Sequence, residues 1–243
     1  MHPKHFARDC GRVLPPWGEK VVRRQKELLQ RKATQAIKNL ERPDPVHRIR
    51  KKLSRWFDPE CKGPNDMVSP SMLIPGPPNW IAGRAHGNLL RLQGLAPPRV
   101  CAAVLRVLWN SWCTARRFQN RFSSKDRCLL GCKGAHDSIE HYSRCPVGRE
   151  ILRKILRVDL QPQRGLAMFT LSTPEQSIDA LLAVSAVYIY SIYCTTNGYR
   201  HTAQPNIPQA KQCMIQHIRQ ACFGHPTLSH IVENRWREQV YFV

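Results

Sequence analysis

The chain has 243 residues, of which 42% are hydrophobic, so it is long enough and apolar enough to fold around a core. It has 38 Lys and Arg residues against 17 Asp and Glu, which gives a net charge of +21. This composition is that of a globular protein, not a low-complexity chain. A positive field of this size favours a polyanion as partner, because basic contacts to phosphates release condensed counterions.

The positive charge is concentrated in the first two-thirds of the chain. Residues 1–60 contain 16 basic and 7 acidic side chains, and residues 81–157 contain 15 and 4. Residues 158–243 contain 6 and 5, so they are almost neutral. We therefore expect the surface that binds the partner in the first two-thirds, and a scaffold in the last third.

The chain opens with a basic segment, residues 1–60, in which apolar residues at helical spacing predict a helix over residues 18–41. Pro and Gly interrupt the next stretch repeatedly, as in "KGPND" and "SPSMLIPGPPNW". Such punctuation is typical of loops. We therefore predict a poorly ordered linker over residues 61–96.

The clearest helical pattern covers residues 97–121 and starts at a Pro-Pro pair, which suits a helix entrance. At about 100° per residue, its apolar face is predicted to contain Cys101, Val104, Leu105, Leu108, Trp112 and Ala115. The opposite face is predicted to carry a basic stripe of Arg99, Arg106, Arg117 and Arg121, with Asn110 among them. A solvated helix face is the alternative, but residues 84–125 contain no acid to form i,i+4 ion pairs. We expect the stripe to contact phosphates.

Further helices are predicted at about 147–157, 174–196 and 207–222, and a last helix or strand in the tail, residues 224–243. Strand signals are weak, so the fold class is mainly α, with a helical domain over residues 97–223. The stretch 180–198 lacks charge, which raises the alternative of a membrane span. Several Ser, Thr and Asn residues dilute this stretch, so we predict a buried helix and no membrane association.

Three cysteines and a histidine follow the spacing Cys128-x3-Cys132-x8-His141-x3-Cys145. Zinc takes four N or S ligands in a tetrahedron, and structural sites supply them in two pairs. "MHPKHFARDC" lacks the apolar region of a signal peptide, so we expect an intracellular protein, not a secreted one, in which a metal explains the cluster better than disulfides do. The sequence thus predicts a small zinc module over residues 126–157.

The two pairs of ligands are expected on different local structures. Gly131 would allow a tight turn between the first two cysteines. Asp137 and Glu140 resemble an N-cap and its N3 partner, so a short helix would carry His141 and Cys145 on one face and end at Pro146. His136 is a competing ligand, but its "KGAHDS" context indicates a loop, so we favour His141.

A catalytic zinc keeps one coordination position open, whereas four protein ligands close the shell. The deaminase pattern H-x-E with P-C-x-x-C is absent from the sequence. We therefore expect a structural Zn²⁺, no catalytic residues and no small-molecule substrate.

The string "RCLLGCKGAHDSIEHYSRCP" resembles the zinc-binding (CCHC) C-terminal region of non-LTR retrotransposon reverse transcriptases. The match includes the four ligands, Asp137-Ser138, Glu140 and Cys145-Pro146, and the resemblance extends over about residues 99–157. The Y/F-x-D-D motif that holds the catalytic metals of these polymerases is absent, and no two acids are adjacent anywhere in the chain. The resemblance therefore implies a piece without the catalytic polymerase domain.

Charge, motif and resemblance together predict a catalytically inactive, zinc-stabilised module that binds RNA or DNA through the phosphate backbone. Besides the stripe, Arg127, Lys133 and Arg144 are expected to contact phosphates. A vestigial or protein-interaction zinc domain is the alternative. The basic runs "RKKLSR" and "RRQK" would permit nuclear import.

Overall fold

A computed structural model describes residues 44–57, 74, 76–115, 117, 127–200, 206–235 and 240–242. Most of these residues are helical. The chain divides into two units, Met1–Pro43 and Asp44–Val243, and all described residues belong to the second. The predicted helix at 18–41 and Arg121 lie outside the described residues.

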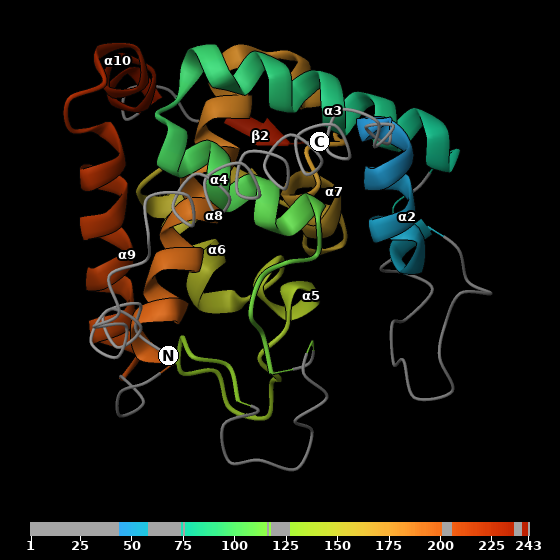
Figure 1. Cartoon of the computed structure of the whole chain (residues 1–243). Helices are drawn as coiled ribbons and strands as arrows, with labels where there is room; N and C mark the ends of the chain where they lie inside the picture. Colours follow the sequence, from blue (N-terminus) through green and yellow to red (C-terminus); the bar gives the residue numbers. More distant parts are fainter. Residues whose placement is uncertain are drawn as a thin grey trace, which may run out of the picture. The chain divides into compact units, whose positions relative to one another are not determined.

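The described elements are almost all helices (Figure 1). The α-helices are α2 (Pro45–Phe57), α3 (Pro78–Leu95), α4 (Pro98–Leu108), α5 (Ile139–Tyr142), α6 (Pro146–Lys154), α7 (Gly165–Phe169), α8 (Asp179–Tyr199), α9 (Ile207–Cys222) and α10 (Pro226–Arg235). Among the elements with described bounds, η4 (Pro162–Arg164) and η5 (Pro174–Ser177) are 3-10 helices. Two three-residue strands, β1 (Val158–Leu160) and β2 (Val240–Phe242), pair in parallel. The prediction of a mainly α fold is confirmed.

Helix α8 is the central element, and α3, α4, α9 and α10 all pack against it. It is buried over almost its whole length from Leu181 to Ile192. By length and composition α8 is apolar enough to cross a membrane, and 78% of its apolar window is buried inside the protein. The prediction of a buried helix in this region is therefore confirmed.

Several helices begin at a proline, which has no backbone N–H to lose in the first turn and has its φ angle already set. Proline occupies the first turn of α3, α4, α6 and α9. Asn206 adds a capping box to α9: its side chain accepts from the Gln209 N–H, and the Gln209 side chain accepts in return. These start signals were all present in the sequence.

The predicted linker over residues 61–96 is wrong for its second half, because Pro78–Leu95 forms α3. This helix buries Ile81, Ala82, Ala85 and Leu92 and packs against α2 and α8. Its three glycines face open space, so they weaken the helix without breaking it. Tertiary packing thus outweighs the local signal from proline and glycine.

The predicted helix over 97–121 is also too long, because α4 ends at Leu108 and Asn110 takes a left-handed φ of 48°. The residues that α4 buries are Val100, Ala103, Val104, Val107 and Leu108, which only partly match the predicted apolar face. Trp112 and Ala115 are buried, but as part of an irregular segment. The predicted arginine stripe therefore does not run along one continuous helix.

Candidate metal centre

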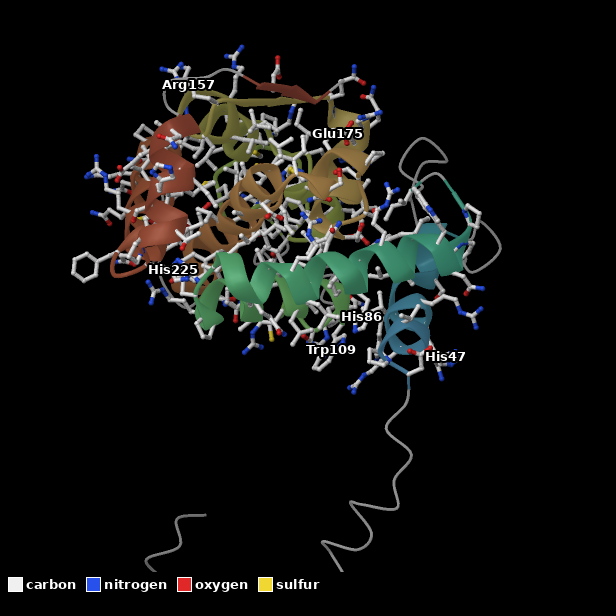
Figure 2. All side chains as sticks on the ribbon, turned by 90° about the horizontal axis from the view of Figure 1, so that it is seen from above. His47, His86, Trp109, Arg157, Glu175 and His225 are labelled. Atoms are coloured by element: carbon white, nitrogen blue, oxygen red, sulfur yellow. The ribbon has the colours of Figure 1, made fainter. Side chains whose placement is uncertain are left out.

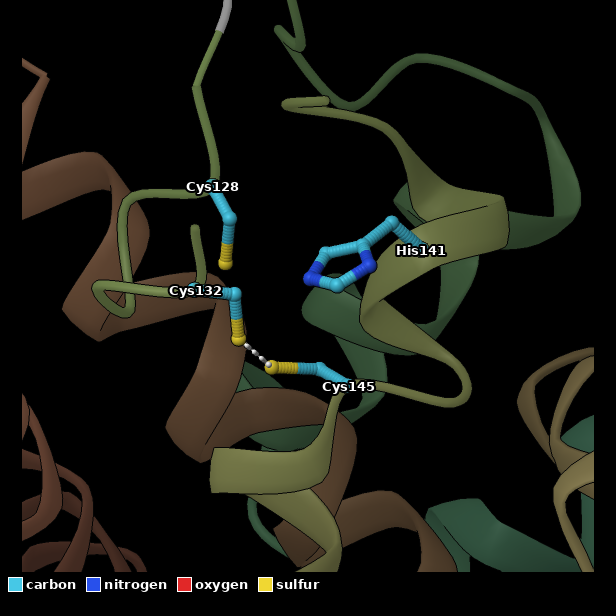
Figure 3. Close-up of side chains that lie close together, drawn as sticks. All are labelled: Cys128, Cys132, His141 and Cys145. Carbon is cyan, nitrogen blue, oxygen red and sulfur yellow. Dashed lines mark hydrogen bonds between the residues drawn. The ribbon is translucent and has the colours of Figure 1, made fainter. Parts of the chain in front are cut away.

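Cys128, Cys132, His141 and Cys145 converge, and one ligand atom from each lies within 4.8 Å of all the others. Figure 3 shows the imidazole of His141 pointing toward the three sulfur atoms. The Sγ atoms of Cys132 and Cys145 are 3.4 Å apart. Cys128 and Cys145 are fully buried, and the other two side chains are half-buried. These four residues could hold a metal ion, as the sequence predicts.

The first two cysteines lie on a tight loop closed by backbone hydrogen bonds. The Cys128 N–H donates to the Ala135 carbonyl at 2.8 Å, and the Gly131 N–H donates to the Cys128 carbonyl at 3.1 Å. Gly131 has a φ of +93°, and a Cβ added there would lie 2.9 Å from Cγ1 of Ile207. The loop therefore needs glycine at this position both for its conformation and for its close approach to α9.

The one-turn helix α5 carries His141, but its cap differs from the predicted one. Ser138, not Asp137, is the N-cap, and its Oγ accepts from the His141 N–H at 3.1 Å. This bond connects the cap directly to the ligand and fixes the backbone of His141. The predicted capping pair of Asp137 and Glu140 is wrong by one residue.

Cys145 does not continue the helix of His141, so the predicted shared helix face is wrong. Helix α5 ends at Tyr142, and Cys145 is the N-cap residue of α6, with Pro146 in its first turn. Pro146 thus begins the following helix, where the sequence suggested that it would end the preceding one. The intervening turn still brings Cys145 beside His141 (Figure 3).

Asp137 has a different role, as a buried acceptor that joins three segments. Its Oδ1 accepts from the Tyr142 hydroxyl at 2.6 Å, and its Oδ2 accepts from the Ala115 N–H at 2.7 Å. Arg200, the residue after α8, donates from its guanidinium to Oδ2 at 3.0 Å. Burial and the neighbouring carboxylate raise the pKa of Tyr142 well above its usual value, so its hydroxyl stays a donor. Asp137 therefore anchors the cluster to the body of the domain.

Glu140 makes a second long-range connection, from α5 to α2. Its Oε1 accepts from the indole Nε1–H of Trp56 at 2.8 Å, and both side chains are buried. The two residues are 84 positions apart in the chain. This pair cannot be predicted from the sequence, because neither a tryptophan on a basic helix nor a glutamate beside a ligand indicates its partner.

His136 is exposed and does not belong to the cluster, which agrees with the choice of His141. The other predicted site residues divide into two groups. Arg127, Lys133 and Arg144 are exposed on or beside the cluster loops. Arg99, Arg106 and Arg117 lie outside the cluster and contact other parts of the protein.

Each of these three arginines contacts a different part of the protein. The Arg99 guanidinium donates to the carbonyls of Gln220, Ala221 and Phe223 at the end of α9. Arg106 lies over the ring of Tyr193, with 5.5 Å from its guanidinium carbon to the ring centroid. Arg117 donates to the Ser111 carbonyl at 2.7 Å. Arg99 therefore caps a helix in the structure, a role that the sequence-based stripe did not predict.

The three thiols share hydrogen bonds that favour one negative charge among them. Hydrogen bonds from Cys128 and Cys145 lower the pKa of Cys132. The corresponding bond to Cys132 raises the pKa of Cys128 to about 11, with burial adding to the effect. Hydrogen bonds to Cys128 and Cys132, together with burial, raise the pKa of Cys145. Ionisation of all three thiols at this spacing needs a cation at the centre.

Comparisons of the chain with protein-family models, with curated proteins and with solved structures find no match to any of them.

Proposed function

We propose that the chain is a nucleic-acid-binding module whose fold is stabilised by one structural Zn²⁺ ion. Three sulfur atoms and one imidazole nitrogen form the donor set of a Cys₃His zinc site. A Zn–S distance of about 2.3 Å requires neighbouring ligand atoms within about 4 Å of one another, and the cluster already approaches this spacing. Four protein ligands fill the tetrahedron, so the ion serves structure.

The position of the cluster supports a structural role for the metal. Its ligands come from a loop with no regular secondary structure, from a four-residue helix and from the start of α6. Such short segments have little helix or sheet of their own to hold them together. A metal that links them contributes its binding free energy directly to folding.

Charge supports a nucleic acid as the partner. Arg127, Lys133 and Arg144 are exposed around the cluster, and within the described residues none of them forms an ion pair. The net charge of +21 adds a long-range attraction for polyanions. We propose that these three side chains contact phosphates without reading the base sequence.

The resemblance of "CLLGCKGAHDSIEHYSRCP" to the zinc-binding region of non-LTR retrotransposon reverse transcriptases supports the same proposal. On this view the chain derives from such a polymerase and binds nucleic acid without catalysing a reaction. The observation that carries the proposal is the convergence of four ligand atoms within 4.8 Å, with the exposed Arg127, Lys133 and Arg144 beside them, in a chain with a net charge of +21.

The test is the salt dependence of binding to labelled RNA and DNA by the zinc-loaded full chain. Each phosphate contact contributes about 0.7 to 0.9 to the slope of log affinity against log salt. Replacing Arg127, Lys133 and Arg144 together by Gln should therefore lower the slope by about two to three. A matched control replaces the exposed Arg153, Arg157 and Arg219, which removes the same charge elsewhere.

The control variant with three substitutions should change the salt-dependence slope less than the variant at Arg127, Lys133 and Arg144 does. Absence of measurable binding to RNA and DNA at low salt would contradict the proposal. That result would favour the second candidate, a protein-interaction or vestigial zinc domain.

A further inference from the structure

Two tryptophans on the domain have an arginine guanidinium placed over the ring. Arg48 of α2 lies over Trp109, at the end of α4, with 4.4 Å to the ring centroid. Arg84 lies over Trp80, in the first turn of α3, at 3.8 Å. Trp80 is 47% exposed and Trp109 is half-buried, so neither ring is enclosed by the core.

Helix α2 lies between these two aromatic sites. Its Arg48 reaches Trp109, while its Arg50 donates to Oδ1 of Asn79, the neighbour of Trp80, at 3.1 Å. Residues 48 and 50 are separated by about 200° around a helix, so the two contacts leave α2 on opposite sides. Figure 2 shows His47 and Trp109 along the same edge of the molecule as α2.

The exposed face of α2 between the two sites is basic. Ile49, Leu53 and Trp56 are buried, whereas Lys51 and Lys52 are exposed together with Arg48. The helix itself contains no acid, and neither do α3 and α4. A cationic side chain therefore lies beside each of the two rings, Arg48 beside Trp109 and Arg84 beside Trp80.

We propose that this surface, formed by α2, the first turn of α3 and the end of α4, binds single-stranded nucleic acid. Arg48, Lys51 and Lys52 contact phosphates, and unpaired bases stack on Trp109 and Trp80. The inference rests on the proposed function and adds to it the form of the nucleic acid and the place where its bases bind.

The pairing of rings with arginines favours a single strand over a duplex. Bases in a duplex are stacked on one another, so only unpaired bases can offer their faces to a side chain. A basic surface with interspersed aromatic rings is the arrangement that binds single strands without sequence preference. A guanidinium is planar and stacks on aromatic faces, so a base can stack on the outer face of Arg48 or Arg84, or take its place over the ring.

The experiment measures the affinity of the zinc-loaded full chain for a labelled oligo(dT), an oligo(U) of the same length and a blunt duplex of the same charge. Trp80→Ala removes a half-exposed ring with little consequence for the core. Trp109→Leu removes the second ring and keeps an apolar side chain. Phe223→Ala is the matched control, because Phe223 is an aromatic residue with 85% exposure at the end of α9.

Each tryptophan substitution should weaken single-strand binding by about fivefold to a hundredfold, the range for loss of one stacked base. Duplex affinity should change by less than about twofold, and Phe223→Ala should match wild type for every probe. Retained zinc content and helical circular dichroism show that a variant is folded. If Trp109→Leu fails this check, Trp80→Ala alone decides.

Wild-type affinity for single strands in folded tryptophan variants would overturn the inference and leave the proposed function standing. Equal losses for duplex and single strand would also overturn it. Failure of the wild-type chain to bind any of the three probes would instead refute the proposed function itself.

Discussion

The hydrogen bond between Glu140 and Trp56 connects the helix that carries His141 to the basic helix α2, and its removal tests whether the two are coupled. The acceptor Oε1 lies 2.8 Å from the indole nitrogen, Glu140 is 3% exposed and Trp56 is 0% exposed. Glu140→Ala removes the acceptor from a buried donor, which costs about 1 to 3 kcal/mol. We expect the free energy of unfolding to fall by that amount.

Glu140→Gln is the matched variant, because an amide oxygen can accept the same hydrogen bond at nearly the same volume. It should lose less than about 1 kcal/mol, the net value of a typical hydrogen bond. Urea unfolding of the zinc-loaded protein, followed by circular dichroism, gives both values. The reasoning is refuted if the alanine variant is as stable as wild type, or if the two variants are equally destabilised.

Three further predictions concern other contacts. Gly131 has a φ of +93°, and an added Cβ would lie 2.9 Å from Ile207. Gly131→Ala should therefore destabilise the zinc-loaded protein by at least about 1 to 2 kcal/mol in thermal unfolding. An unchanged midpoint would contradict the requirement for glycine in this turn. Raised pKa values, about 11 for Cys128, keep Cys128 and Cys145 protonated at pH 7 without metal. Zinc must displace both protons, so the affinity for zinc should rise between pH 6 and 8 by up to about a hundredfold per pH unit. Competition with a chelator measures this affinity, and a zinc affinity independent of pH would contradict the prediction. Arg99→Gln removes the cap of α9 and should lower the free energy of unfolding in urea by about 1 kcal/mol. Its nucleic-acid affinity should fall no more than that of a variant in which another single exposed arginine is replaced by Gln.

The sequence predicted the parts of the structure that depend on local chemistry. Zinc-like spacing identified the four residues that converge, and helical context separated His141 from His136. Apolar content identified α8 as a buried helix, and the helix predicted at about 207–222 coincides with α9. Each of these signals lies within a short stretch of the chain, so it can be recognised in a single sequence.

The features that the sequence did not predict depend on contacts between distant segments. The sequence predicts a linker where α3 lies because glycines weaken the local helical signal and a Pro- and Gly-rich stretch precedes it, whereas packing against α2 and α8 stabilises the helix. The strand pair joins residues 82 positions apart, Val158 and Val240, and three residues are too few for a periodic pattern.

Asp137 and Glu140 show the same limit within the metal centre. Their spacing before a short apolar stretch is typical of a capping box, yet the structure uses both as buried acceptors for Ala115, Arg200 and Trp56. A hydrogen-bond partner more than twenty residues away leaves no periodic signal in the sequence.

The most direct test of the central claim is the zinc content of the purified full chain, measured by atomic emission together with far-UV circular dichroism. Wild type and His136→Asn should each contain one equivalent of zinc. Cys145→Ser and His141→Asn should lose it, and part of the helical signal with it, because binding of the ion and folding are coupled. Undiminished zinc in Cys145→Ser and His141→Asn, or loss of zinc in His136→Asn, would contradict the assignment of the centre.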